Sequence, residues 1–314
     1  MSIIKSWKFW AMLAAGLAWS RMPWFVRNNY QVQVLFRITL FAALGLAWNL
    51  VGGYAGQLSL GHVAFFGVGA YGLALFTQLS IPVWISVLLA ALVATLFAAL
   101  IGVISFRLRG PYFALATIAF GEVLRLTATN LDVTGGAIGL TVPPLFTGRT
   151  LWRQFYLAAV ALAVLAFLTN LWVSRSRFGY YLMAIREDED TASAVGINNA
   201  RCKLQALLLS AFLTALAGAL YGSAFQFIVP DSILTLEISI QIAIITMLGG
   251  AGTLLGPIIG AALLLTASEV FKNQFKESHL LIYGVLIVVV VLFLPEGIVG
   301  GLQHHFRKRT RPPA

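Results

Sequence analysis

The stretch Ile38 to Phe106, ITLFAALGLAWNLVGGYAGQLSLGHVAFFGVGAYGLALFTQLSIPVWISVLLAALVATLFAALIGVISF, runs for 69 residues without one Asp, Glu, Lys or Arg. One bilayer crossing needs about 20 apolar residues, so three crossings fit within it. Backbone polar groups in hydrocarbon must be satisfied internally, and the long Leu, Ala and Phe runs lack the alternation of a membrane β-barrel. The stretch therefore predicts transmembrane α-helices and an all-α fold.

The rest of the chain has the same character, with 60% hydrophobic and 10% charged residues among 314. We interpret residues 1–314 as one domain, a polytopic helical bundle with about ten membrane segments. They are 7–26, 34–52, 58–79, 82–106, 112–130, 154–174, 204–228, 236–250, 254–271 and 280–299. The first also resembles a secretory signal, but no small-residue cleavage site follows it, so we expect a retained helix. The eighth and ninth are short and joined through glycine, which leaves spanning, interfacial and re-entrant arrangements open.

The net charge of +10 would suit a nucleic-acid partner only if the basic residues gathered on one face, whereas here they stand between apolar segments. We thread the chain back and forth across the membrane, with the first residue in the cytoplasm and each segment crossing once. This threading places 13 of the 21 Lys and Arg in the cytoplasm and seven outside, while Arg125 falls within a segment. Because cytoplasmic loops carry the excess of Lys and Arg, we expect both termini and the polar loop 174–203 in the cytoplasm. The basic run Phe306 to Arg311 is expected to meet anionic membrane lipid.

Motifs of catalysis and metal binding do not stand out in the sequence. No GxxxxGK[ST] phosphate loop occurs, so an ATP-driven process would need its ATPase on another chain. Cys202 is the single cysteine, and no second ligand stands at a suitable helical spacing from any histidine. We therefore expect no enzyme activity, cofactor or metal in this chain.

Two glycine-rich turns share a GG(x)AGxL pattern, at Gly52 to Leu58 and at Gly249 to Leu254. Glycine-interrupted segments at matching places in two halves often mark the central pathway of a transporter, so the pair suggests an internal repeat. GxxxG steps occur at Gly218 and Gly222, and again from Gly252 through Gly256 to Gly260. We interpret these steps as close helix packing within the subunit, in preference to a dimer-forming or pore-lining role.

The loop 174–203 contains REDED (Arg186 to Asp190) followed by TASAVGI (Thr191 to Ile197). Acidic residues then fall in the first turn of a short helix, where the helix dipole favours them, and Gly196 can end that helix. Asn198 or Asn199 can cap the next membrane helix. These residues fit two interpretations equally well: a docking element for a cytoplasmic partner, and a loop that is merely solvated.

Five polar residues in or next to apolar segments are candidates for a translocation path. Glu122 and Arg125 stand three residues apart in one segment, so they share a helix face and can neutralise each other. A structural ion pair is the preferred interpretation, although a zwitterionic amino acid would need one acidic and one basic partner. Gln57, Ser59 and His62 could also line a polar path, whereas a histidine hydrogen-bonded to a neighbouring helix is the simpler interpretation of His62.

Four blocks of the sequence resemble the permease family of branched-chain amino acid ABC importers. They are GYAGQLSLGHVAFFGVGAY (Gly53 to Tyr71), RGPYFALATIAFGEVLRLTATN (Arg109 to Asn130) with GGAIGL (Gly135 to Leu140), AIREDEDTASAVGIN (Ala184 to Asn198) and LGGAGTLLGPIIGAALL (Leu248 to Leu264). The resemblance implies a bacterial inner-membrane subunit that works with a second permease subunit, two cytoplasmic ATPase subunits and a periplasmic binding protein for Leu, Ile or Val. Ile138 stands where the family often has a polar residue, so the role of the loop 131–152 stays open.

The same resemblance makes Ala184 to Asn198 a coupling helix that meets an ATPase subunit. It implies charged contacts from Arg186, Glu187, Asp188, Glu189 and Asp190, apolar contacts from Ala192, Ala194 and Val195, and a matching glycine at Gly196. A urea or short-chain amide permease is an alternative that one sequence does not separate from this interpretation. An ion-driven secondary transporter and a membrane scaffold protein are further alternatives, which differ in needing no ATPase partner.

Overall fold

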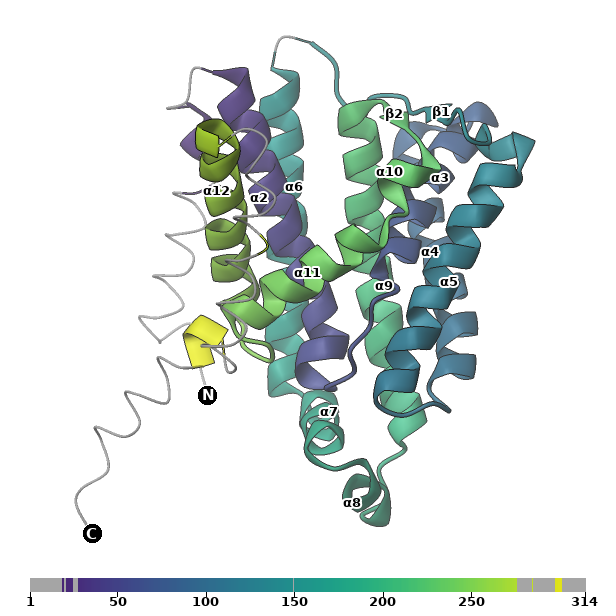
Figure 1. The fold of residues 1–314 in the computed structure, drawn as a ribbon, viewed down its shortest axis with the longest axis vertical. Coiled ribbons are helices and arrows are strands. Elements are labelled where there is room, and N and C mark those ends of the chain that lie inside the picture. Colours follow the sequence, from purple (N-terminus) through teal and green to yellow (C-terminus); the bar gives the residue numbers. More distant parts are fainter. Residues whose placement is uncertain are drawn as a thin grey trace, which may run out of the picture.

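The computed structural model describes residues 28–148 and 150–275, together with residues 19, 21–24, 284 and 297–300. Within these residues the chain forms helices joined by turns (Figure 1). The helices are α2 (Asn29–Trp48), the π-helical turn Asn49–Tyr54, α3 (His62–Gln78), α4 (Val83–Ser105), α5 (Pro111–Asn130), the 3-10 turn Asp132–Thr134, α6 (Leu151–Arg175), α7 (Arg177–Glu187), α8 (Glu189–Ala194), α9 (Asn199–Phe225), α10 (Pro230–Ile233), α11 (Leu236–Gly249) and α12 (Gly256–Phe275). The strands β1 (Leu140–Thr141) and β2 (Phe227–Ile228) pair antiparallel, which is the one departure from the all-α prediction in the described chain.

Eight of the predicted membrane segments correspond to helices, with ends that differ by at most five residues. The segments 7–26 and 280–299 lie mostly outside the described residues. Five described stretches are long and apolar enough to cross a membrane: Asn29–Tyr54, Val83–Ser105, Leu151–Arg175, Asn199–Phe225 and Pro230–Gly249. The prediction of about ten crossings is therefore not confirmed. One reason is α3, whose 17 residues span only about 26 Å, less than the hydrocarbon core of about 30 Å.

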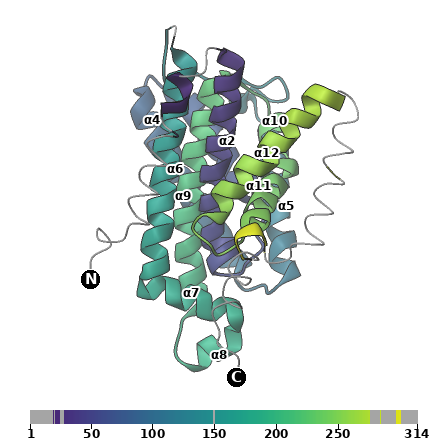
Figure 2. The same cartoon turned by 90° about the vertical axis from the view of Figure 1, so that its left-hand side faces the viewer.

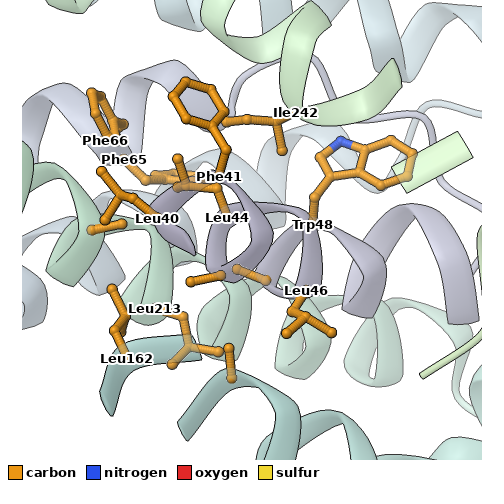
Figure 3. Close-up of a cluster of buried hydrophobic side chains, with 14 of the residues drawn as sticks. Leu40, Phe41, Leu44, Leu46, Trp48, Phe65, Phe66, Leu162, Leu213 and Ile242 are labelled. Atoms are coloured by element: carbon orange, nitrogen blue, oxygen red, sulfur yellow. The ribbon is translucent and has the colours of Figure 1, made fainter. Parts of the chain in front are cut away.

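Helix α2 forms the centre of the bundle, because every residue from Ile38 to Trp48 is buried and all of them except Thr39 are apolar. Of the most apolar 18 residues within Asn29–Tyr54, 83% are buried inside the structure. Figure 3 shows Leu40, Leu44 and Trp48 of this helix among side chains from α3, α6, α9 and α11. By contrast, only 33% of the most apolar 18 residues of α4 and 28% of those of α6 are buried, as expected for helices that face lipid.

Glycines allow helices α3 and α9 to approach each other closely. A Cβ atom added to Gly218 of α9 would lie 1.9 Å from the Phe66 carbonyl oxygen, and one added to Gly69 of α3 would lie 2.1 Å from the Ala215 carbonyl oxygen. Gly260 of α12 likewise faces the Ile245 carbonyl oxygen of α11, at 1.9 Å. The prediction that the GxxxG steps pack helices within the subunit is thus confirmed for Gly218 and Gly260.

The two ends of the bundle differ in structure. In both views α7 and α8 project from one end, whereas Figure 1 shows the β1–β2 ladder at the other (Figures 1 and 2). Segments that the threading placed together in the cytoplasm do meet at the α8 end, since Asp190 pairs with Arg109, and Glu189 accepts a hydrogen bond from Gln57. These described turns, which the threading assigns to one side of the membrane, therefore do lie at one end of the bundle.

Candidate coupling element

The element formed by α7 and α8 is bounded by polar caps that the sequence supplies locally. The Ser176 hydroxyl accepts a hydrogen bond from the Gly179 amide and starts α7. Asp188 then adopts an extended conformation, with φ −159° and ψ 118°, which ends α7 and starts α8. As predicted, Glu189 and Asp190 fall in the first turn of α8. The predicted coupling helix is thus two helices with a bend at Asp188.

Asp188 caps α8 by accepting a hydrogen bond from the Thr191 amide at 2.5 Å. This backbone bond holds the pKa of the Asp188 carboxyl below its usual value, and a hydrogen bond with the Thr191 side chain makes the second largest contribution. The negative charge also lies at the positive end of the helix dipole. Asp188 therefore acts as an ionised cap at neutral pH.

Gly196 ends α8 as the sequence predicts. Its φ of +88° is in the left-handed region, its amide bonds the Ser193 carbonyl, and the Ile197 amide bonds the Ala192 carbonyl. These two bonds form a Schellman motif, which satisfies the last carbonyls of the helix. Asn198 then accepts a hydrogen bond from the Arg201 amide and caps α9. Of the two predicted caps, Asn198 is the one that starts the next membrane helix.

Arg186, in the last turn of α7, reaches back to the membrane helices. Its Nη1 atom donates a hydrogen bond to the Gly53 carbonyl oxygen at 2.8 Å, although the residue as a whole remains exposed. Gly53 belongs to the first of the two glycine-rich turns, which closes the π-helical end of α2. One predicted ATPase contact therefore has a partner within its own chain.

The two glycine-rich turns lie against each other beside Arg186. The Asn49 side chain joins them, because its Oδ1 accepts from the Gly252 amide at 2.8 Å and its Nδ2 donates to the Thr253 carbonyl at 3.0 Å. A second bond of Asn49 Nδ2, to Asn170 Oδ1 at 3.1 Å, adds α6 to this junction. We name Asn49, Gly53, Asn170, Gly252 and Thr253 the glycine-turn junction.

Glu189 forms a second attachment on the other side of the bend. Its carboxylate pairs with Lys203 of α9, whose side chain is 2% exposed, and it accepts a hydrogen bond from Gln57 Nε2 at 3.0 Å. A buried ammonium is stabilised only when it is paired, so this contact fixes α8 to the start of α9.

The remaining predicted contact residues divide into exposed and buried. Glu187, Asp190, Ala194 and Val195 are exposed, with Val195 at 73%, and Asp190 is paired with the exposed Arg109 at 3.0 Å. Ala192 is 2% exposed and packs into the bundle. An open groove of about 430 Å³ lies next to Val195, lined by Phe178, Tyr181, Val195, Gly196, Ile197, Asn198, Arg201, Cys202 and Gln205. These exposed groups and the groove are the surface available to a partner.

The candidate path residues fall into three separate places, of which the first is the contact of Gln57 with Glu189 of α8 described above. Ser59 and His62 lie in the interior, where His62 Nδ1 meets Ser59 Oγ at 3.1 Å and His62 Nε2 meets Ser210 Oγ of α9 at 2.7 Å. Because Ser210 already donates its proton to the Ala47 carbonyl, His62 Nε2 must be the donor in the second contact. His62 is thus hydrogen-bonded to a neighbouring helix, as its simpler interpretation predicts.

Glu122 and Arg125 form the expected ion pair on α5, with oxygen and nitrogen 2.5 Å apart. Arg125 also pairs with Asp231 of α10, a residue that lies outside the predicted segments. All three are at least partly exposed in this chain, with the Glu122 side chain at 51%. No other candidate path residue joins this cluster, which we name the α5–α10 charge cluster.

Four polar residues of these sites were missed by the sequence interpretation: Asn49, Asn170, Lys203 and Asp231. Asn49 and Asn170 offered a signal, because each is an amide within a long apolar run, where a partner is required. Lys203 and Asp231 stand at segment ends and look like ordinary loop charges. Among the described residues, no group of three or more His, Cys, Asp or Glu could hold a metal ion.

Comparison with known proteins places the chain in a family. The family described as "Branched-chain amino acid transport system / permease component" matches residues 30–291. The high-affinity branched-chain amino acid transport system permease protein LivM of Salmonella typhimurium is 31% identical, over 92% of this chain and 73% of its own length. The permease protein LivH of Escherichia coli is 24% identical, over 86% of this chain and 96% of its own length. A chain of PsaBC from Streptococcus pneumoniae in complex with Fab is similar in structure, with a TM-score of 0.47 and 15% identity, over 89% of this chain and 97% of that one. The match over residues 30–291 and the identity to LivM show that the chain belongs to the family of permease components of branched-chain amino acid transport systems.

Proposed function

We propose that this chain is the membrane permease subunit of an ABC importer that moves branched-chain amino acids across the bacterial inner membrane. Separate ATPase subunits supply the energy. The observation that carries the proposal, beside the family, is the capped pair α7 and α8, which leaves one end of an apolar bundle and is bonded back to the π-helical turn, to the loop after it and to α9. A solvated loop would need no such attachment.

The α8 end is the cytoplasmic end in this proposal, because Arg107, Arg109, Arg175, Arg177, Arg186, Arg201 and Lys203 all belong to it. The ATPase subunit would contact Glu187, Asp190 and Val195 and the groove beside them. A periplasmic binding protein would meet the opposite end, where Ile138 is 82% exposed.

The α5–α10 charge cluster marks the side of the bundle that faces the second permease subunit and the translocation path. Charged groups facing hydrocarbon are strongly unfavourable, and these three side chains are open to the surroundings of this chain. We therefore place Glu122 and Arg125 in the wall of the path, with Gln57, Ser59 and His62 behind it in the interior. Replacing Glu122 with Gln is expected to lower transport while assembly stays normal, and unchanged transport would remove the residue from the path.

The test is transport by a reconstituted complex of this chain with its second permease subunit, its ATPase subunits and its binding protein. ATP-dependent uptake of Leu, with competition by Ile and Val but not urea, is the expected result. Competition by urea alone would favour the amide permease alternative. Uptake by this chain alone, on an ion gradient without ATP, would favour a secondary transporter and contradict the proposal.

A further inference from the structure

The glycines of the two turns leave room for the side chain of Arg186. A Cβ atom on Gly252 would lie 2.5 Å from Arg186 Nη1, and one on Gly56 would lie 2.8 Å from Arg186 Cγ. A Cβ atom on Gly53 would lie 1.9 Å from Asn49 Oδ1 and 2.6 Å from the Gly252 amide nitrogen. The glycines that the two turns share thus permit the turns to touch and Arg186 to enter between them.

The junction connects helices that are far apart in the chain. Through Asn49 it includes the end of α2, and through Gly252 and Thr253 it includes the turn between α11 and α12. The connection is repeated one turn up the helices, because the Thr246 hydroxyl of α11 shares its proton between the Gly45 carbonyl of α2 at 3.1 Å and the Ile242 carbonyl of its own helix at 3.0 Å. A displacement of Arg186 along α7 would therefore act on α2, α11 and α12 together.

We infer that Arg186 is a positioning residue that transmits movement of the α7–α8 element to the glycine-turn junction, rather than a residue that holds the ATPase subunit. This inference rests on the proposed function. Glu189 plays a different part, since it fixes α8 to Lys203 at the start of α9. The charged run Arg186 to Asp190 then divides into inward residues for transmission, Arg186 and Glu189, and outward residues for docking, Glu187 and Asp190.

The experiment uses the reconstituted complex with Arg186→Ala, Arg186→Lys and a matched control, Arg177→Ala, at the exposed start of the same helix. Two quantities are measured: the ATPase subunit retained on the tagged permease, and the Leu imported per ATP hydrolysed. Arg186→Ala is expected to retain the ATPase while import per ATP falls about tenfold, in the range of mutations that change coupling between sites. Arg186→Lys should give an intermediate value, because a lysine can still donate to the Gly53 carbonyl, and Arg177→Ala should match the wild type.

Gly252→Ala provides a second variant that leaves α7 and α8 unaltered. Its methyl group would displace the guanidinium, and an alanine is also strained at the φ of +82° found there, so a loss of import per ATP at least as large as that of Arg186→Ala is expected. Loss of the ATPase subunit from Arg186→Ala, or import per ATP equal to the wild type in both variants, would overturn the inference. Absence of ATP-dependent uptake in the wild-type complex would instead contradict the proposed function.

Discussion

Lys203 places a positive charge in an almost fully buried position, where it pairs with the carboxylate of Glu189. Replacing Lys203 with Met would leave that carboxylate partly buried without its counter-charge. Because Glu189 is 22% exposed, water would compensate some of the loss, and we expect destabilisation of about 2 kcal/mol. Thermal unfolding of the purified permease in detergent measures the change.

Lys272→Met is the matched control, because Lys272 is an exposed residue in the last turn of α12. Its unfolding temperature should stay close to that of the wild type. Adding Glu189→Gln to Lys203→Met should recover part of the lost stability, since the unpaired charge is then removed. If Lys203→Met and Lys272→Met unfolded at the same temperature, the pair would not hold α8 to α9.

The Asp188 cap predicts a local response to acid. Its pKa is lowered in the folded chain, so the stability it adds to α8 is present above the unfolded pKa of about 3.9 and is lost as the pH falls through the lower folded pKa. The Thr191 amide should therefore be protected from hydrogen exchange at neutral pH, and this protection should be lost as the pH falls through the folded pKa. Asp188→Ala should raise this exchange at neutral pH, whereas Asp188→Asn, which keeps an acceptor oxygen, should raise it less. Equal exchange in the wild type and Asp188→Ala would show that the cap does not protect the helix.

The role of a single residue could be predicted from the sequence where its neighbours along the chain determine that role. It could not be predicted where contacts with distant segments determine it. The caps at Asp188 and Asn198 and the turn at Gly196 depend on neighbours within three residues, and the sequence indicates the last two correctly. The inward direction of Arg186 depends on Gly53, which is 133 positions away. A six-residue helix has too little periodicity to show which face is buried, so the burial of Ala192 was equally invisible.

At the scale of elements, the contact between α3 and α9 depends on glycine. Gly218→Ala would set a methyl carbon 1.9 Å from the Phe66 carbonyl oxygen, so the two helices must separate. Overpacking of this kind is expected to destabilise the fold by about 1–3 kcal/mol, measured as a lower unfolding temperature. Gly121→Ala on α5 is the control, because its added methyl would meet only a Val63 methyl at 3.3 Å. An equal effect of both variants would mean that helix propensity, rather than the close approach, sets the result.

The sequence predicts the long helices well because each is a run of apolar residues ended by a charge, glycine or proline. It misses the short elements. The π-helical turn Asn49–Tyr54 and the four-residue helix α10 depend on contacts with distant segments, and the pairing of Leu140 with Ile228 joins residues 88 positions apart. Such elements gain too few local bonds to be visible as a pattern.

At the scale of the whole molecule, the attachments at the α8 end connect one short element to helices from both parts of the chain. Arg186 reaches the turn after α2 and the turn before α12, while Glu189 reaches α9. Among the described residues, the opposite end carries the small β1–β2 ladder and the exposed loop with Ile138. This difference between the ends predicts a fixed direction in the membrane.

Cysteine labelling tests that direction with one residue at each end. Cys202 is the single native cysteine, so a Cys202→Ala background allows Ile138→Cys and Val195→Cys to be labelled separately; their native side chains are 82% and 73% exposed. In intact spheroplasts, a membrane-impermeant thiol reagent should label position 138 and not position 195, because basic residues gather at the α8 end. Inside-out vesicles should reverse the result, and the Cys202→Ala background alone should remain unlabelled in both. Labelling of position 195 in intact spheroplasts would place the coupling element outside the cell, where no ATPase subunit can reach it.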